Sequence, residues 1–362
     1  MKFYDILQCS PDVLKRMIRS SDDPQEIKRL RRGMIVRSLL IVVFAIAFIG
    51  VMAALFGSDN SAMAVSIFCI LLAVRFVNYG YCLRDSILNM AIVFALLLVA
   101  PVASYAVDPV LKFLMDGLSL FVILMMTSDD PKMGNGGLYS FAFIFLTGNP
   151  VEGQAFVNRA WMTLIGFVLC ALVYAHNHKD QNANVTFWSK IRRFSLYEYK
   201  DQWRIRLAVG VGLLLAVFSS IHLERFMWAG FACGSLLSDV DVEARIREKF
   251  SDRLLGVVLG SAAFYVVYTI LPASLYPLVG PVGGLCLGLC TEYKHKTALN
   301  CFGALMLAAG MYGVEAAVWI RIADTLIGIV FALAFFYVYD RFVLHRFLPH
   351  RSHYGARKEE KK

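Results

Sequence analysis

The chain has 362 residues, of which 58% are hydrophobic and only 17% are charged. This apolar excess excludes an ordinary soluble domain and predicts an all-α polytopic membrane protein. Its 36 lysines and arginines outnumber its 27 acidic residues, which gives a net charge of +9. Basic cytoplasmic loops account for this balance better than nucleic-acid binding does, so no nucleic-acid partner is expected.

Residues 1–33 form a predicted basic, cytoplasmic N-terminal segment. Between Pro11 and Arg32, apolar residues such as Leu14 are mixed with many lysines and arginines. This mixture is typical of an interfacial helix on the anionic headgroups of a bilayer. The sequence Asp22-Asp23-Pro24 is expected to break that helix in two, because proline disrupts a helix interior.

Twelve apolar segments follow, and we predict about twelve transmembrane helices from them. They lie near 34–56, 61–78, 86–107, 109–127, 138–148, 159–176, 205–221, 226–238, 253–271, 275–290, 298–312 and 319–341. A polar, basic linker at 177–204 separates a first half, 34–176, from a second half, 205–341. Segment 138–148 is shorter than the roughly 20 residues that a crossing requires, so it is either re-entrant or extended by its neighbours.

The distribution of basic residues predicts an orientation. With the N-terminus inside and the segments alternating, only four of the 36 basic residues fall on the outer side, namely Lys112, Arg159, Arg225 and Arg321. Positive charge accumulates on the cytoplasmic side of membrane proteins. Both termini, the 177–204 linker and the basic tail at 342–362 are therefore predicted to be cytoplasmic.

The two halves are predicted to be parallel six-helix repeats. Arg159-Ala-Trp-Met-Thr-Leu-Ile-Gly166 matches Arg321-Ile-Ala-Asp-Thr-Leu-Ile-Gly328 at an offset of 162 residues, and Asp130 meets Glu292 at the same offset. Both halves start inside and hold six segments. This pattern predicts an internal duplication with a pseudo-two-fold axis along the membrane normal.

A recognisable pattern lies between Trp203 and Gly260. Arg206 leads one apolar helix, Trp228 opens the next, and Arg253-Leu-Leu-Gly-Val-Val-Leu-Gly260 starts a third. In this order the residues resemble the fusaric acid resistance and aromatic acid exporter family. The resemblance implies a bacterial plasma (inner) membrane protein that extrudes aromatic acids or other amphipathic organic anions. A second copy of the chain or an accessory efflux subunit is then a candidate partner.

Arg159 and Arg321 are candidate substrate-binding residues at the outer ends of segments six and twelve. Two guanidiniums suit a carboxylate, because their fork of donors matches its two oxygens. The alternative is that both arginines extend to lipid headgroups. Asp324 is expected to neutralise Arg321 in part, so Arg159 is expected to carry the freer charge. Trp228 is a further substrate-binding candidate.

Asp116 and Asp324 are candidates for proton coupling. Each carboxylate lies inside an apolar segment, where a charge is costly unless it faces a partner or a cavity. For Asp324 the alternative is a simple ion pair with Arg321, three residues away.

Glycines give two further expectations. Gly280, Gly283 and Gly284 surround Pro281, which favours a broken helix beside a substrate path, with close helix packing as the alternative. Gly256 and Gly260 follow Arg253 on one helix face, and small residues four apart let a neighbouring backbone approach closely.

The remaining motifs point away from an enzyme. Eight cysteines contain no CxxC pair, and the seven histidines have no ligand spacing within a span, so neither a metal nor a cofactor is expected. No nucleophile and base are spaced for catalysis. Because a nucleotide-binding motif is also missing from the sequence, a proton-driven exporter is the first hypothesis. The alternatives are a passive anion channel and a non-transporting membrane scaffold whose basic inner face recruits a partner.

Overall fold

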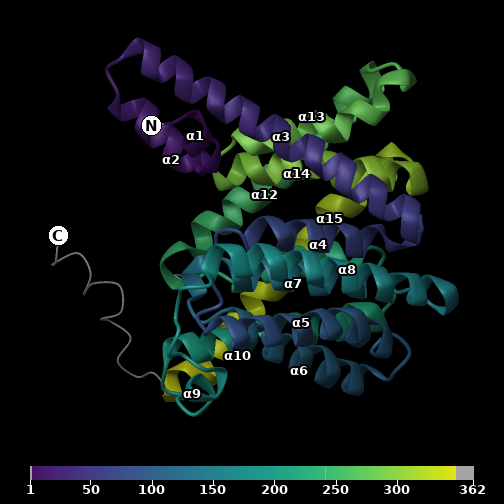
Figure 1. Cartoon of the computed structure of the whole chain (residues 1–362). Coiled ribbons are helices and arrows are strands. Elements are labelled where there is room, and N and C mark those ends of the chain that lie inside the picture. Colours follow the sequence, from purple (N-terminus) through teal and green to yellow (C-terminus); the bar gives the residue numbers. More distant parts are fainter. Residues whose placement is uncertain (1, 241, 348–362) are drawn as a thin grey trace. The chain divides into compact units, whose positions relative to one another are not determined.

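The computed structural model describes residues 2–240 and 242–347, and for 242–247 it describes the backbone alone. Every regular element in the described part of the chain is helical (Figure 1). Each of the twelve predicted segments coincides with a helix: α3 (Pro24–Phe56), α4 (Ser61–Ala73), α5 (Leu83–Ala103), α6 (Pro109–Thr127), α7 (Asn135–Thr147), α8 (Gly153–His178), α10 (Tyr199–Ser220), α11 (Phe226–Leu237), α12 (Val242–Ile270), α13 (Tyr276–Leu289), α14 (Tyr293–Tyr312) and α15 (Val314–Tyr339).

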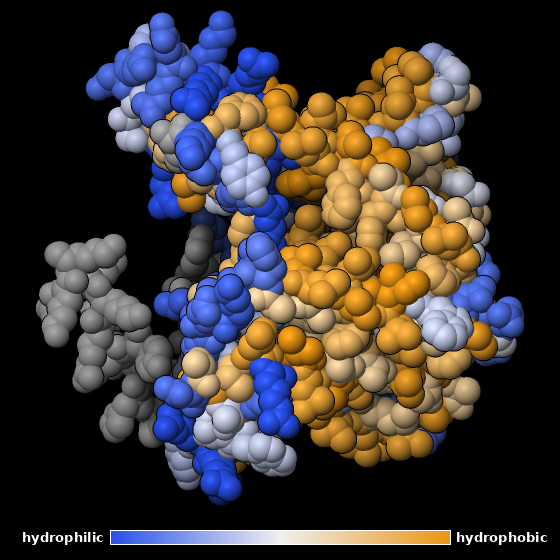
Figure 2. Space-filling model, in the orientation of Figure 1, coloured by the Kyte–Doolittle hydropathy of each residue, from blue (hydrophilic) through white to orange (hydrophobic). Residues whose placement is uncertain are grey.

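Seven helices in the described residues are long and apolar enough to cross a membrane: α3, α5, α6, α8, α10, α12 and α15. Figure 2 shows apolar side chains over the outer faces of the helices and hydrophilic ones gathered around α1 (Phe3–Gln8), α2 (Pro11–Ser20) and α9 (Phe187–Ile191). The prediction of an all-helical, multi-pass membrane protein is thus confirmed. That all twelve helices cross the bilayer stays a prediction, and most of the 342–362 tail lies outside the described residues.

The chain forms two compact units, and each is discontinuous in sequence. Unit 1 comprises residues 1–51 and 244–326, and unit 2 comprises 52–243 and 327–362. Three long helices, α3, α12 and α15, run from one unit into the other. Each unit therefore draws residues from both predicted halves.

Unit 1 begins with a small helical module made of α1, α2 and the start of α3. Ser10 caps α2 by accepting a hydrogen bond from the Val13 amide (3.4 Å), and α3 begins at Pro24, where the helix was expected to break. Leu14 is fully buried in a core with Ile6 and Leu30. The apolar side of α2 is therefore packed against protein, and its contact with anionic headgroups stays a prediction.

Close backbone contacts organise the membrane helices of unit 1. A Cβ atom at Gly256 would lie 2.6 Å from the Lys294 carbonyl oxygen, and one at Gly260 would lie 2.6 Å from the Cα atom of Ala298. Helix α12 thus lies directly against α14, the geometry that small residues four apart permit. On α3, the Ser38 hydroxyl donates to the Leu285 carbonyl of α13 (2.7 Å).

Helix α13 is continuous from Tyr276 to Leu289 with Pro281 inside it. This corrects the expectation of a broken helix. Proline removes one backbone hydrogen bond and strains the preceding turn. Here the helix continues because its other turns keep their hydrogen bonds and pack on α3 and α14.

Unit 2 contains α4 to α11 and the end of α15, and α6 and α10 meet in it backbone to backbone. A Cβ at Gly212 would lie 2.8 Å from the Cα of Gly117. The short helix α4 runs along α8 and is bonded to it at both ends. Asn60, just before α4, accepts from Arg159 near the start of α8, and the Val74 carbonyl, just after α4, meets His178, the last residue of α8 (2.9 Å).

Helix α10 begins at Tyr199, earlier than the predicted residue 205. The prediction placed its start after the charges at Asp201 and Arg204, which hydropathy assigns to a linker. In the structure both side chains are buried. They are stable there because each is paired and hydrogen-bonded, which offsets the cost of removing a charge from water.

Candidate functional site

Arg321 is buried in α15, with 5% of its surface exposed. It lies seven residues after the start of the helix, about 10 Å along the axis at 1.5 Å per residue. Its electrostatic neighbours include Cys301 of α14, Arg253 of α12 and Asp324 one turn further along α15. The charge of Arg253 therefore acts on Arg321 within unit 1.

Arg253 lies nearer to the surface and is half-buried. Its Nη1 atom donates to the Tyr293 hydroxyl at the start of α14 (3.0 Å). One turn earlier on α12, the Lys249 ammonium lies 5.7 Å from the centroid of the same tyrosine ring. Lys249, Arg253, Tyr293 and Arg321 form what we call the basic cluster of unit 1.

The basic cluster has the chemistry of a site for an aromatic or other amphipathic carboxylate. Guanidiniums offer paired donors to a carboxylate, and a tyrosine ring offers an apolar face on which an aromatic group can stack. Asp324, 3% exposed, brings one negative charge to the same buried region. Its role in proton coupling stays a prediction.

Arg159 has different surroundings in unit 2. It is 1% exposed, and its Nε atom donates to Asn60 Oδ1 (2.9 Å), Nη1 to the Asn149 carbonyl (2.9 Å) and Nη2 to the Asp59 carbonyl (3.2 Å). These bonds tie α8 to the turns before α4 and after α7. The expectation that Arg159 carries the freer charge finds no support in these contacts, and its role in substrate binding stays a prediction.

Asp116 is fully buried in α6 and forms an ion pair with Lys112, four residues earlier (3.0 Å). The lysine also donates to the carbonyl oxygen (3.3 Å) and the hydroxyl (3.2 Å) of Ser104 at the end of α5. Sequence reasoning placed Lys112 among the outer basic residues and missed this pair. The available signal was the spacing of four, which puts the two residues on one helix face.

Trp228 is buried in the first turn of α11. The Arg225 guanidinium lies 5.8 Å from its ring centroid. Because the ring is covered, the structure gives Trp228 a packing role, and a contact with substrate stays a prediction.

The three predicted glycines of α13 lie in three different environments. Gly280 has open space where a Cβ would be, Gly283 is tight against Phe302 (2.9 Å), and Gly284 is in ordinary contact with Val42 of α3 (3.6 Å). The structure does not bring them together into one lining. Their assignment to substrate binding stays a prediction.

A polar hub at the start of α10, which sequence reasoning missed, joins several elements of unit 2. Arg204 donates to the Ser128 carbonyl (2.7 and 3.1 Å) and pairs with Asp201, while Arg206 donates to the carbonyls of Leu237 (3.1 Å) and Asp239 (2.8 Å). This hub holds the turns after α6 and α11. A run of buried polar residues directly before an apolar helix cannot be distinguished from a linker by hydropathy alone.

Tyr81, in the turn before α5, belongs to the same end of unit 2. Its hydroxyl donates to the Met125 carbonyl (2.5 Å). Burial raises the pKa of this tyrosine, so it stays a neutral donor. The turn is therefore fixed by a bond that does not change over the physiological pH range.

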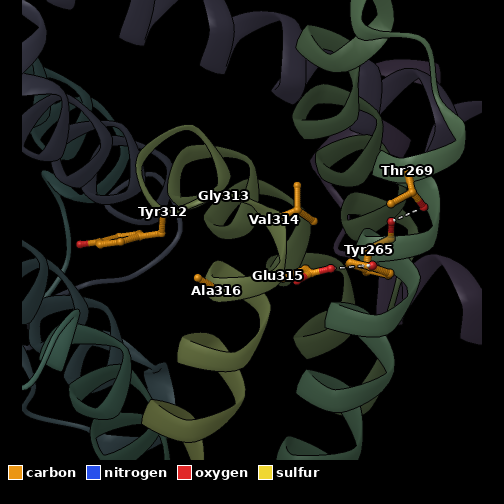
Figure 3. Close-up of a pocket in the computed structure, with 7 residues that line it drawn as sticks. All are labelled: Tyr265, Thr269, Tyr312, Gly313, Val314, Glu315 and Ala316. Atoms are coloured by element: carbon orange, nitrogen blue, oxygen red, sulfur yellow. Dashed lines mark hydrogen bonds between the residues drawn. The ribbon is translucent and has the colours of Figure 1, made fainter.

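A shallow hollow of about 420 Å³ lies in unit 1, between the end of α12 and the turn from α14 to α15 (Figure 3). Its wall includes the Glu315 carboxylate, which accepts a hydrogen bond from the Tyr265 hydroxyl (3.3 Å). Tyr312 points away from these two side chains in Figure 3. A carboxylate in the wall repels an organic anion, so the hollow is a poorer candidate for the substrate site than the basic cluster.

Comparison with known families gives a match in the second half of the chain. Residues 210–335 match the model of a family described as fusaric acid resistance protein-like. The comparison with curated proteins gives no match, and no solved structure matches either. The resemblance seen in the sequence is confirmed over this region, and together with the apolar helices it indicates a multi-pass membrane protein of transporter type.

Proposed function

We propose that the protein exports small amphipathic organic anions, aromatic carboxylates in particular, across a bacterial plasma membrane. The observation that carries the proposal is the basic cluster of unit 1. It places the Arg253 guanidinium on the Tyr293 hydroxyl, and Arg253 is an electrostatic neighbour of the buried Arg321 on α15. A positive charge inside a membrane bundle is costly, and such charges commonly mark the path of an ion or substrate.

The proposed orientation has the Arg204 end of unit 2 in the cytoplasm. Hydrogen bonds and ion pairs gather the turns after α4, α6, α8 and α11 at that end. These turns carry many basic residues: Arg75, Arg84, Lys132, Lys179, Lys190, Arg192 and Arg193. The opposite end, around Arg159, carries few. This asymmetry supports cytoplasmic termini, because positive charge concentrates on the inner side.

Two lysine contacts support the proposed internal repeat. In unit 2, Lys190 of α9, before the second half, pairs with Asp129 after α6 (2.6 Å). In unit 1, Lys15 of α2, before the first half, donates to Thr291 after α13 (3.3 Å). Asp129 and Thr291 are separated by the 162-residue offset of the matching motifs. Each half thus receives a lysine from the segment that precedes the other, as a parallel duplication would arrange.

The short helices support the proposal of twelve crossings. Helix α4 has only 13 residues, but it is bonded to both ends of α8. The 14 steps from Asn60 to Val74 rise about 21 Å. A short helix can therefore connect the two ends of the bundle beside a longer neighbour.

The test is export from cells that carry the gene, compared with cells that lack it, using a panel of radiolabelled aromatic and other weak organic acids. Arg321→Gln and Arg253→Gln are compared at matched membrane expression with Arg321→Lys, which keeps the charge, and with Lys28→Gln, which removes an exposed charge on α3. We expect both glutamine variants to lose export about tenfold, because one charged hydrogen bond contributes roughly 1.5–3 kcal/mol.

Three outcomes separate the proposal from its alternatives. Accumulation against a gradient that a protonophore abolishes supports a proton-driven exporter. Flux that only follows the anion gradient indicates a passive channel. A chain that moves none of the acids and instead co-purifies with a defined protein is a scaffold. If both glutamine variants export at the wild-type rate, the basic cluster does not lie on the substrate path.

A further inference from the structure

The ion pair between Lys112 and Asp116 is buried inside unit 2. The exposed fractions of the two side chains are 6% and 0%, and Nζ lies 3.0 Å from Oδ2. The lysine has two more acceptors at Ser104. Removing one partner of such a pair leaves an uncompensated buried charge, whereas removing both is often neutral. The pair therefore responds strongly to any event that changes one charge alone.

The helices packed against α6 are α5, α7 and α10. In the described residues, their charged side chains lie toward the other end: Arg84 and Asp85 open α5, and Lys200, Asp201, Arg204 and Arg206 lie in the first turns of α10. Arg204 is bonded to Ser128, twelve residues beyond Asp116 and about 18 Å along α6. Helix α7 contributes no charged residue; its Tyr139 contacts Tyr79 through their hydroxyls. Lys112 is thus the charge that faces Asp116.

The pair has no counterpart in the second half of the chain. At the 162-residue offset, Lys112 and Asp116 correspond to Ser274 and Leu278. A pair required merely to build the bundle would be expected in both halves of a duplication. The presence of the pair in the first half alone favours a function that the second half does not share.

We propose that Asp116 and Lys112 are the proton-binding site that couples the proton gradient to export, an inference that rests on the proposed proton-driven function. When the Asp116 carboxylate takes one proton, the net charge of the pair rises from zero to plus one, and it returns to zero when that proton leaves. The adjacent residue, Gly117, touches the backbone of α10 at Gly212. A movement of α6 that follows the loss of the ion pair is therefore passed directly to α10.

The experiment compares Asp116→Asn, Lys112→Met and the double variant Asp116→Leu/Lys112→Met. We expect each single variant to give several-fold less assembled protein, because one buried group loses its partner. The double variant is expected to assemble at the wild-type level. Its gradient-driven accumulation of substrate should fall at least tenfold, and its export should no longer depend on pH. Loss of a purely structural ion pair would change neither readout in a variant that assembles normally.

Infrared titration of the purified full-length protein in lipid gives a second readout that needs no substrate. The wild type is expected to show a protonated carboxyl band that grows as the pH falls and is missing from Asp116→Asn and from the double variant. Glu315→Gln, which removes an exposed carboxylate, is the control and should keep the band.

The outcomes distinguish the inference from the proposed function. A double variant that exports with the wild-type pH dependence overturns the inference while the exporter stands. If the wild type moves no organic acid, the proposed function is wrong. If, in addition, no carboxyl band assigned to Asp116 titrates, the proton-binding site is wrong as well. A titrating Asp116 in a protein that moves no organic acid keeps the proton site and rejects the anion as its substrate.

Discussion

Arg159 and Arg321 occupy the same position in two matching motifs, but unit 2 and unit 1 use them differently. Arg159 donates to three oxygen atoms from turns that are distant in sequence. Arg321 has a second guanidinium, that of Arg253, among its neighbours. The first arginine is held by the turns around it, whereas the electrostatic neighbours of the second include both Arg253 and Asp324. The repeated Arg-x-x-x-Thr-Leu-Ile-Gly motif thus places an arginine at the same position in each half, whereas the residues packed around each arginine differ.

Charged residues elsewhere in the two units also have different neighbours. Unit 2 compensates Lys112 with Asp116 and Arg204 with Asp201. Unit 1 places Lys249 and Arg253 one turn apart on the same helix, around one tyrosine. Substitutions at Arg159 and in the polar hub of unit 2 should therefore act mainly on stability, and substitutions in the basic cluster mainly on transport.

The largest expected effect is at Arg204 in the polar hub of unit 2. Arg204→Ala leaves Asp201 and the Ser128 carbonyl without their buried donor, and we expect a loss of about 3–5 kcal/mol in the free energy of unfolding. Thermal unfolding in detergent measures it. The control, Lys200→Ala, breaks a partly exposed pair with Glu198 and should cost at most about 1 kcal/mol. Equal stability of the two variants would contradict a framework role for the hub.

The next effect tests the two arginines directly. Arg159→Gln removes most of three hydrogen bonds from a charged donor and should destabilise the protein by about 2–4 kcal/mol. Arg321→Gln should reduce export about tenfold, because it removes a guanidinium from the proposed substrate site. Stability and export are measured on the same preparations. The reverse pattern, with Arg159 controlling export and Arg321 stability, would break the comparison.

A smaller effect is expected from packing in unit 1. Gly260→Leu forces a side chain into the backbone of α14 and should cost about 1–3 kcal/mol. Gly303→Leu is the control on α14, because open space surrounds its missing side chain. The melting temperatures of the two variants provide the measurement. If both melt like the wild type, close approach of the two backbones is not needed at Gly260.

The smallest effect concerns orientation and leaves stability unchanged. In a background without the eight native cysteines, Ala183→Cys and Ser58→Cys place a thiol at exposed positions on opposite ends of unit 2. An impermeant maleimide added to intact cells should label the thiol at position 58 and fail at position 183 until the membrane is opened. The opposite labelling would invert the assignment of the cytoplasmic end.

The sequence alone determined the class of the protein and the position of nearly every apolar helix. This was possible because length and hydrophobicity are local properties and a bilayer requires long apolar helices. The spacing of Gly256 and Gly260 likewise indicated a close helix contact before any partner was known.

Tertiary structure decided which charges belong to the framework. Arg159 finds Asn60 across 99 residues of sequence, and Arg204 finds Ser128 across 76. Such partners come together only after the helices have packed. Their hydrogen bonds then offset the free-energy cost of removing a charge from water. For this reason the early start of α10, the continuity of α13 and the pairing of Lys112 with Asp116 were beyond what hydropathy predicts.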